Sequence, residues 1–342
     1  MSRTSWLATP WRRQLHSSSR RAQQPLRSVE VASPSSRGNL DIRAFQEKAF
    51  LPQKPYLFPI EAGSPASRLP AFSKWFNRSA SVHDSHSTLP FASYLVRELQ
   101  EWPFPYELIR SPGPQDVVSQ FQHALMTSSE VTEQIMAGIL QSEATDGHGQ
   151  SFFQLYAPFR LLIKALEFNA ARDSTTTHPL HLYIAQSSLH DLPEPLQADL
   201  STPEIVLCAG KGDIYASSIW LGTEPTYTPL HRDPNPNLFC QLYSQKVVRL
   251  LPPTFGDELF FDIQRQIRQH GNSRIRTADM MQGQERKALH QAVWKAEKSP
   301  EKLHQVELRA GDALFIPEGW WHSVKSLESD GGLNGSVNWW FR

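Results

Sequence analysis

Three residues that could bind a metal ion stand out in the C-terminal half of the sequence. His231 and Asp233 lie two positions apart in TPLHRDPNPN, and His322 follows the turn PEGW in GDALFIPEGWWHSV. Side chains two apart on a strand point to the same side, so the histidine and the aspartate share one face. Burying both would be costly unless a partner compensates their polarity. Two imidazoles and one carboxylate form the facial set that holds non-haem Fe(II) and leaves positions for a cosubstrate and O2.

Each of these residues also has an ordinary structural explanation. A single histidine near a strand end is commonly a hydrogen-bonded core or surface residue, and an aspartate before a proline commonly caps a turn. Neither explanation accounts for an HxD pair, a proline-broken corner and a later histidine in a Gly-Asp…Pro-Glu-Gly-Trp-Trp-His frame in one chain. The combination favours a metal site.

From residue 181 onward the sequence is a series of short β segments that would carry these residues. The segments read HLYIAQ, IYASSIWLG, FCQLYS, KVVRLLP, ALFIP, HSVKSL and SVNWWF, and Gly, Pro, Asn or Asp separate them. Such punctuation is typical of an antiparallel sandwich or barrel. A charged, Gln-rich stretch at residues 256–304 interrupts the series and is expected to be helical.

The sequence before the β series is expected to support it. LDIRAFQEKAF predicts a short helix, and PYLFPI predicts a buried strand. Residues 64–90, rich in Ser, Pro and His without periodicity, are expected to form a loop, whereas residues 116–141 show a helical apolar stripe. We therefore expect a basic tail at 1–38, a support region of helices and strands at 39–180, and a β core at 181–342.

Residues 183–341 resemble the jumonji-C, or cupin-like, family of Fe(II)/2-oxoglutarate oxygenases, on the HxD pair and the later histidine frame. The similarity is greatest to the small hydroxylase branch that includes the asparaginyl hydroxylase of hypoxia-inducible factor. DIRAFQEKAFLPQKPYLFP resembles the lead-in of that branch, whereas residues 60–180 match only loosely. The resemblance implies a mostly β fold, a double-stranded β-helix (jelly roll) with N-terminal supporting helices and one helical insertion.

The resemblance also implies roles for individual residues. It gives the iron ligands as His231, Asp233 and His322, and the residues around the cosubstrate as Tyr183, Thr228, Asn237, Lys246 and Asn338. Lys246 would pair with the far carboxylate of 2-oxoglutarate, because a buried cation and hydroxyl partners offer charge-assisted hydrogen bonds. The family often has Gly-x-Lys here, whereas this chain has Ser-Gln-Lys, so its turn must form without glycine.

The implied reaction is oxidative decarboxylation of 2-oxoglutarate to succinate, coupled to hydroxylation of a substrate C–H bond by O2. We expect the substrate to be a protein side chain. Alternatives that stay open are a small metabolite or modified tRNA base, demethylation of histone lysine, and a non-catalytic binding module. The sequence stops after the expected last strand, where the hypoxia-factor hydroxylase has a helical dimerisation module. We therefore expect no such module, and the oligomeric state stays open.

Composition narrows the possible partners. Lys plus Arg and Asp plus Glu both total 34, so global charge gives no argument for nucleic acid or an anionic membrane. Two cysteines are too few for a zinc-finger reader or a disulfide framework. No apolar run approaches the ~20 residues that span a bilayer.

The N-terminal composition bears on localisation. The first acidic residue is Glu30, and the 29 residues before it contain six Arg and six Ser. An Arg- and Ser-rich, acid-poor start without an apolar segment is typical of an organellar transit peptide. The sequence predicts a mitochondrial protein, with a nuclear signal or a cytoplasmic basic tail as the alternatives.

Overall fold

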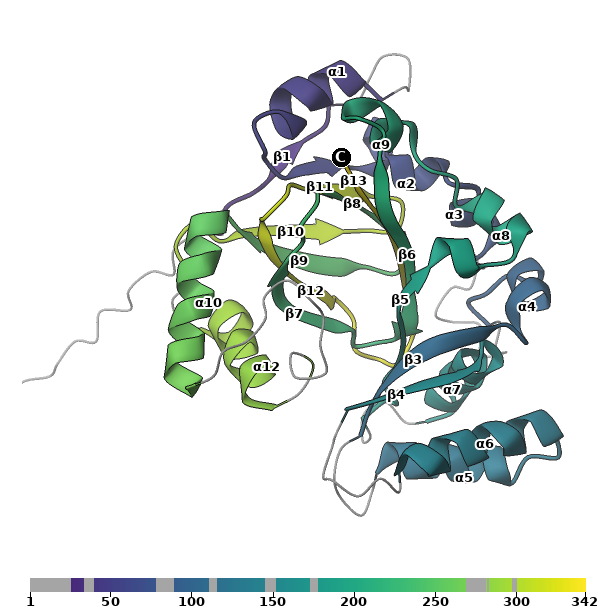
Figure 1. Cartoon of the computed structure of the whole chain (residues 1–342). Coiled ribbons are helices and arrows are strands. Elements are labelled where there is room, and N and C mark those ends of the chain that lie inside the picture. The colour runs from purple at the N-terminus through teal and green to yellow at the C-terminus, as the bar shows by residue number, and fades with distance from the viewer. Residues whose placement is uncertain are drawn as a thin grey trace, which may run out of the picture.

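Two β-sheets face each other at the centre of the molecule (Figure 1). This computed structural model describes residues 26–33, 40–77, 89–110, 116–144, 152–172, 178–268, 281, 283–296 and 300–342. The larger sheet contains, in spatial order, β1 (Glu30–Val31), β2 (Tyr56–Phe58), β11 (Ala313–Ile316), β8 (Asn237–Tyr243), β13 (Leu333–Phe341), β6 (Ile214–Thr223), β5 (Leu182–Ser188), β3 (Pro103–Ile109) and β4 (Phe152–Pro158). The smaller sheet contains β10 (His304–Leu308), β9 (Lys246–Leu251), β12 (Trp321–Ser326) and β7 (Tyr227–Arg232).

The chain from β6 to β13 crosses repeatedly between the two sheets. β6, β8, β11 and β13 lie in the larger sheet, and β7, β9, β10 and β12 lie in the smaller one. Neighbours in both groups pair antiparallel. This is a double-stranded β-helix, so the predicted jelly-roll fold is confirmed.

Strand alternation decides which residues face the space between the sheets. On β9, Val248 and Leu250 belong to the apolar cluster between the sheets, whereas Leu251 packs outward. Lys246 lies two residues before Val248 on this strand, so its side chain is on the same, inward face. On β12, Val324 lies in the same inner cluster, which places His322 on the inner face as well.

Three helical segments cover the outer face of the smaller sheet: α10 (Pro253–Ile267), α12 (Gly283–His290) and the π-helical η4 (Gln291–Lys295). α10 starts with Pro253 in its first turn, where proline is tolerated because that N–H has no helical partner. Gly256 lets α10 lie directly on β12, since a Cβ there would be 2.1 Å from the ring of Trp321. The predicted helical insertion is confirmed, with β10 closing it at its C-terminal end.

The remaining helices pack on the outer side of the larger sheet and around its β3–β4 end. They are α1 (Ile42–Phe45), the π-helical η1 (Gln46–Phe50), the 3-10 helix η2 (Ile60–Ala62), α2 (Pro65–Arg68), α3 (Pro70–Lys74), α4 (Ser93–Leu99), α5 (Val117–Met126), α6 (Val131–Ala144), α7 (Arg160–Ala170), the 3-10 helix η3 (Leu189–Asp191), α8 (Glu194–Asp199) and α9 (Glu204–Ala209). The predicted helix at 116–141 is two helices, α5 and α6.

Two predictions about the N-terminal half were wrong. The expected loop at 64–90 contains α2 and α3, each with a proline at its first position, and residues 78–88 lie outside the described residues. The boundary of the basic tail at residue 38 was also wrong. β1 pairs with β2, and the Arg27 N–H donates to Leu303 O over 3.0 Å. The folded body therefore includes residues 26–33, and residues 1–25 lie outside the description.

Strands of the support region join the sheet of the barrel. β2 pairs with β11, and β3 pairs with β5, so the larger sheet runs across the expected boundary at residue 180.

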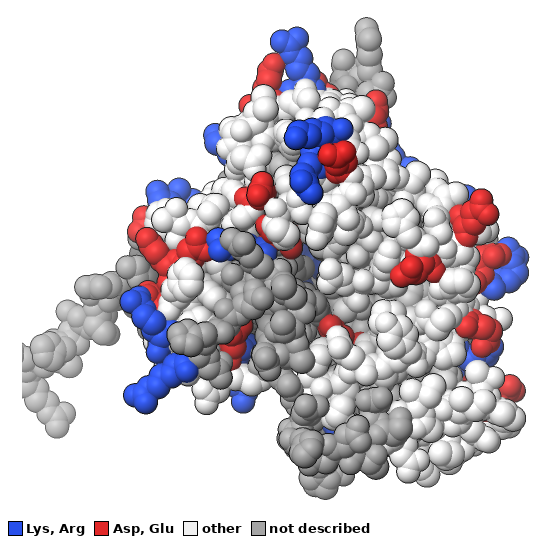
Figure 2. Space-filling model, in the orientation of Figure 1, with Lys and Arg blue, Asp and Glu red and all other residues white. Residues whose placement is uncertain are grey.

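In the described part of the chain, no helix is both long and apolar enough to cross a bilayer. On the face shown in Figure 2, basic and acidic side chains are interspersed, in keeping with the balanced charge.

Candidate metal and cosubstrate site

The predicted metal ligands converge between the two sheets. His231 on β7 and His322 on β12 are direct cross-strand partners, and Asp233 follows the end of β7. The two imidazole centroids are 4.2 Å apart. The Asp233 carboxylate lies 3.9 Å from Nε2 of His231 and 3.5 Å from Nε2 of His322. One ligand atom from each of the three residues lies within 4.8 Å of the other two. Among the described residues, no other group of three His, Cys, Asp or Glu side chains is as close together. Three donors at these distances can surround one cation.

Backbone carbonyls fix which nitrogen of each histidine faces the cluster. Nδ1 of His231 lies 2.9 Å from Pro229 O, and Nδ1 of His322 lies 3.1 Å from Trp320 O. Because a carbonyl only accepts hydrogen bonds, each Nδ1 carries the proton and each Nε2 keeps its lone pair. This is the arrangement that orients imidazole toward a metal, so the donor set fits Fe(II).

A β-bulge places Thr228 on the same side as His231. Residues three apart on a regular strand face opposite sides. Here His231 pairs with His322 and Thr228 pairs with Val324, so β7 uses one more residue than β12 over this interval. The extra residue rotates the strand, as bulges do. Both Thr228 and His231 consequently line one cavity.

A chain of side-chain hydrogen bonds orients Asp233. Asn237 Nδ2 donates to Asp233 Oδ2 over 2.9 Å, and Asn338 Nδ2 donates to Asn237 Oδ1 over 3.2 Å. The indole N–H of Trp220 donates to Asn338 Oδ1 over 2.7 Å. The two predicted asparagines thus act on the carboxylate, one directly and one through its neighbour. Such support of a ligand fixes its orientation toward the metal.

Lys246 supplies a buried positive charge to the same cavity. The residue is 2% exposed, and its Nζ donates to Ser336 Oγ over 2.9 Å and to Tyr183 Oη over 3.3 Å. The ammonium also lies 5.3 Å from the centre of the Phe239 ring. A carboxylate entering this cavity would meet a cation with hydroxyl groups beside it, which is the surrounding that binds a carboxylate tightly.

The structure brings all eight predicted site residues together around one cavity of about 90 Å³. That volume exceeds what one water molecule needs several-fold, so the cavity has room for more than a single water. Five further residues line it and were not foreseen: Gln186, Trp220, Phe239, Val324 and Trp340. Ser336, the hydrogen-bond partner of Lys246, was also missed. Alternation along SVNWWF was the available signal, because Ser336 lies two residues before Asn338 and faces the same side.

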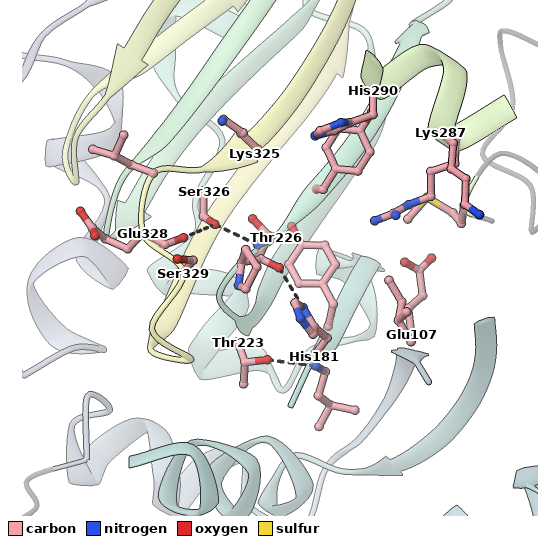
Figure 3. A pocket seen from close by; sticks show the side chains of 18 of the residues that line it. Glu107, His181, Thr223, Thr226, Lys287, His290, Lys325, Ser326, Glu328 and Ser329 are labelled. Atoms are coloured by element: carbon pink, nitrogen blue, oxygen red, sulfur yellow. Dashed lines mark hydrogen bonds between the residues drawn. The ribbon is translucent and has the colours of Figure 1, made fainter. Parts of the chain in front are cut away.

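A larger cleft of about 730 Å³ lies beside this cavity, and Tyr183 lines both. In the close-up of the cleft (Figure 3), His181 and Thr226 contribute to one wall, and Lys325 and His290 approach from β12 and α12. Burial lowers the pKa of His181 and of Lys325, so these groups are less readily charged than in water. The cleft offers a binding surface for a second molecule next to the cavity that contains the metal donors and Lys246.

The fold and the site together define a jelly-roll barrel with a two-histidine, one-carboxylate metal set. A family model described as a cupin-like domain matches residues 66–342. The chain belongs to this cupin-like domain family, and several proteins to which it is similar are named as jumonji-C domain proteins.

Three relatives illustrate the similarity. Lysine-specific demethylase JMJ30 of Arabidopsis thaliana is 28% identical over 52% of this chain and 37% of its own length. Jumonji C domain-containing protein 5 of Drosophila melanogaster is 31% identical over 42% of this chain and 33% of its own length. Lysine-specific demethylase 8 of Danio rerio is 29% identical over 46% of this chain and 36% of its own length. The match therefore spans about a third of each relative.

Proposed function

We propose that this protein is an Fe(II)/2-oxoglutarate-dependent oxygenase that hydroxylates a C–H bond of a protein side chain. The observation that carries the proposal is one cavity holding both a cluster of three metal donors and a buried ammonium. Lys246 with Ser336 and Tyr183 would bind the far carboxylate of 2-oxoglutarate. His231, Asp233 and His322 would hold iron.

The roles of the chain's own residues follow from their contacts. Iron held by these residues would activate O2 with 2-oxoglutarate as the co-reductant, so that one oxygen atom would end in succinate, released together with CO2, and the other in the substrate C–H bond. Asn237 keeps the Asp233 carboxylate turned toward the metal position. The protonated Nδ1 atoms keep both imidazoles in the tautomer that donates through Nε2. The protein thus contributes orientation and electrostatics.

The substrate side chain would approach through the cleft that shares Tyr183 with the cavity. The cleft is much larger than the cavity, about 730 Å³ against 90 Å³, and suits a polypeptide segment better than a second small acid. Its rim carries both signs of charge, including Lys287 and Glu328. This mixture gives no support for a nucleic-acid substrate, which requires a positively charged groove.

Demethylation of N-methylated lysine is the second candidate, and the names of several relatives favour it. JMJ30 of Arabidopsis thaliana and demethylase 8 of Danio rerio are both called lysine-specific demethylases. The chemistry is the same up to the hydroxylated product, since hydroxylation of an N-methyl group gives a hydroxymethyl amine that releases formaldehyde. The two candidates differ only in which C–H bond lies at the metal.

One experiment tests both candidates. Purified protein with Fe(II), 2-oxoglutarate and O2 is incubated with methylated and unmethylated protein extracts, and succinate, formaldehyde and peptide masses are measured. We expect succinate together with peptides that gain one oxygen. Loss of a CH2 unit with formaldehyde would establish demethylation instead. Succinate production no higher than with an Asp233→Ala control, and no modified peptide, would refute the oxygenase proposal.

We also propose a mitochondrial location, based on the six arginines and six serines that precede Glu30.

A further inference from the structure

The corner between β8 and β9 contains a non-glycine residue in the left-handed region. The chain leaves the larger sheet at Tyr243 and enters the smaller sheet at Lys246, so Ser244 and Gln245 make the whole crossing. Ser244 has φ +59°. This conformation is unfavourable for any side chain with a Cβ, and serine adopts it only where the surroundings hold it there.

A buried carboxylate holds this corner. The Ser244 hydroxyl donates to Glu224 Oε1 over 2.7 Å, and Asn334 Nδ2 donates to the same oxygen over 2.7 Å. Glu224 is 2% exposed and Asn334 is fully buried. Burial raises the pKa of Glu224, while the two hydrogen bonds oppose that rise. Burial of this carboxyl group would be costly without hydrogen bonds, and here Ser244 and Asn334 provide them.

Asn334 extends the cluster to the backbone of the corner. Its Nδ2 also donates to Gln245 O over 3.0 Å, and its Oδ1 accepts from Gln241 Nε2 over 3.1 Å. Gln241 Nε2 donates in addition to Tyr243 O over 2.7 Å. Each residue of the crossing between β8 and β9 is therefore bonded to this cluster, which we call the corner cluster: Glu224, Gln241, Ser244 and Asn334.

The corner cluster is continuous with the cosubstrate residues through β13. Asn334, Ser336 and Asn338 alternate along β13 and face the same side. Asn334 holds the corner, and Ser336 accepts the hydrogen bond from Lys246. Asn338 belongs to the chain of hydrogen bonds that orients Asp233. A shift of the corner would move Lys246, the first residue of β9, relative to its partner on β13.

We propose that Glu224, which lies outside the cavity, is a positioning residue for the cosubstrate. Through the Ser244 hydroxyl and Asn334 it holds the left-handed corner that sets where Lys246 enters the barrel. This inference rests on the proposed function for the identity of the ligand, 2-oxoglutarate, but the placement of β9 can be measured without it.

The sharpest test compares two variants at one position. Ser244→Ala keeps a Cβ in the left-handed region and loses the hydrogen bond, whereas Ser244→Gly loses the same bond and adopts φ +59° without strain. We expect Ser244→Ala to weaken 2-oxoglutarate binding, measured by calorimetry on Fe(II)-loaded or Mn(II)-loaded protein, by roughly five- to tenfold. Ser244→Gly should stay within about twofold of wild type.

Variants of Glu224 give the matched second comparison. Glu224→Gln keeps the oxygen that accepts both hydrogen bonds and should bind 2-oxoglutarate nearly as wild type does. Glu224→Ala should weaken binding by about tenfold, and the double variant Glu224→Ala/Ser244→Gly should recover most of the loss. If Glu224→Ala fails to fold, the comparison of 2-oxoglutarate affinity between Ser244→Ala and Ser244→Gly still tests the inference.

Amide hydrogen exchange at the start of β9, over residues 246–248, gives a readout independent of the ligand. Exchange there should quicken in Ser244→Ala and not in Ser244→Gly. Equal 2-oxoglutarate affinities and equal exchange in all variants would overturn the inference, as would equal losses in Ser244→Ala and Ser244→Gly. Wild-type protein that binds no 2-oxoglutarate would refute the proposed function instead, and the exchange rates would still decide the role of Glu224.

Discussion

Replacing Lys246 with methionine should separate cosubstrate binding from folding. Lys246 is 2% exposed and donates hydrogen bonds to Ser336 and Tyr183. Methionine has a similar length, carries no charge and can pack against the Phe239 ring that already contacts the lysine. The barrel should therefore stay folded, and the cavity should lose only its cation and two donated hydrogen bonds.

The magnitude follows from the contacts that 2-oxoglutarate would lose. A hydrogen bond to a charged group contributes roughly 1.5–3 kcal/mol, and breaking a buried charge pair costs roughly 3–5 kcal/mol. Tyr183 and Ser336 retain their hydroxyl groups, so part of the carboxylate recognition remains. We expect a loss of about 3 kcal/mol, which corresponds to a rise in Kd of roughly a hundredfold.

The assay is titration of 2-oxoglutarate into metal-loaded protein without substrate, so that turnover does not enter. Metal content and circular dichroism are measured in parallel and should match wild type, because Lys246 lies outside the donor cluster. Lys246→Arg is the charge-retaining control and should lose less affinity. An unchanged Kd in Lys246→Met would show that the cosubstrate carboxylate binds elsewhere and would refute the assignment.

Four further predictions concern other parts of the molecule. Asp233→Ala should lose tightly bound Fe(II) while its circular dichroism stays that of a folded barrel, and a folded variant with full iron content would exclude the metal assignment. Asn237→Ala should weaken metal affinity by about ten- to a hundredfold, since the hydrogen bond that orients Asp233 is lost; unchanged affinity would contradict that role. Burial lowers the pKa of His181 in the folded protein below its ordinary value of 6.5. As the pH falls below about 6.5, the unfolded state therefore binds a proton before the folded state does, and the free energy of unfolding decreases. His181→Asn should reduce the drop in Tm between about pH 7 and pH 5.5, and an identical drop would refute the linkage. Residues 1–25 fused to a fluorescent reporter should direct it to mitochondria, and a cytosolic or nuclear signal would exclude the proposed location.

The metal donors could be predicted from the sequence because their evidence is local. An HxD pair followed by prolines specifies two ligands on one strand face and the end of that strand. The GDALFIPEGWWHSV frame marks a turn, a strand and a turn before His322, which limits where that histidine lies in the barrel. The short β segments with their punctuation likewise predicted an antiparallel sandwich or barrel, the charged, Gln-rich stretch at 256–304 predicted the helical insertion, and the family resemblance implied the jelly roll.

Other features depended on partners distant in sequence, which a single sequence does not specify. β3 and β4 were not predicted, because they complete their backbone hydrogen bonds with each other, about 50 residues apart, and in the case of β3 also with β5, about 75 residues later. Residues 26–33 join the fold for the same reason, since β1 adds to β2 and Arg27 bonds to Leu303.

The sequence by itself determined which chemistry is possible, and the tertiary structure decided which residues carry it. Residue types, spacing and strand alternation are local properties, and they indicated the three candidate metal donors, whereas the role of Lys246 was implied only by the resemblance to a family. The position of Thr228 required a bulge that exists only against β12. The corner cluster joins Glu224 to Ser244 and Asn334 from three separate strand ends. Hydrogen bonds across such distances in sequence arise only when packed sheets bring the strands together, because long-range contacts are set by the whole fold.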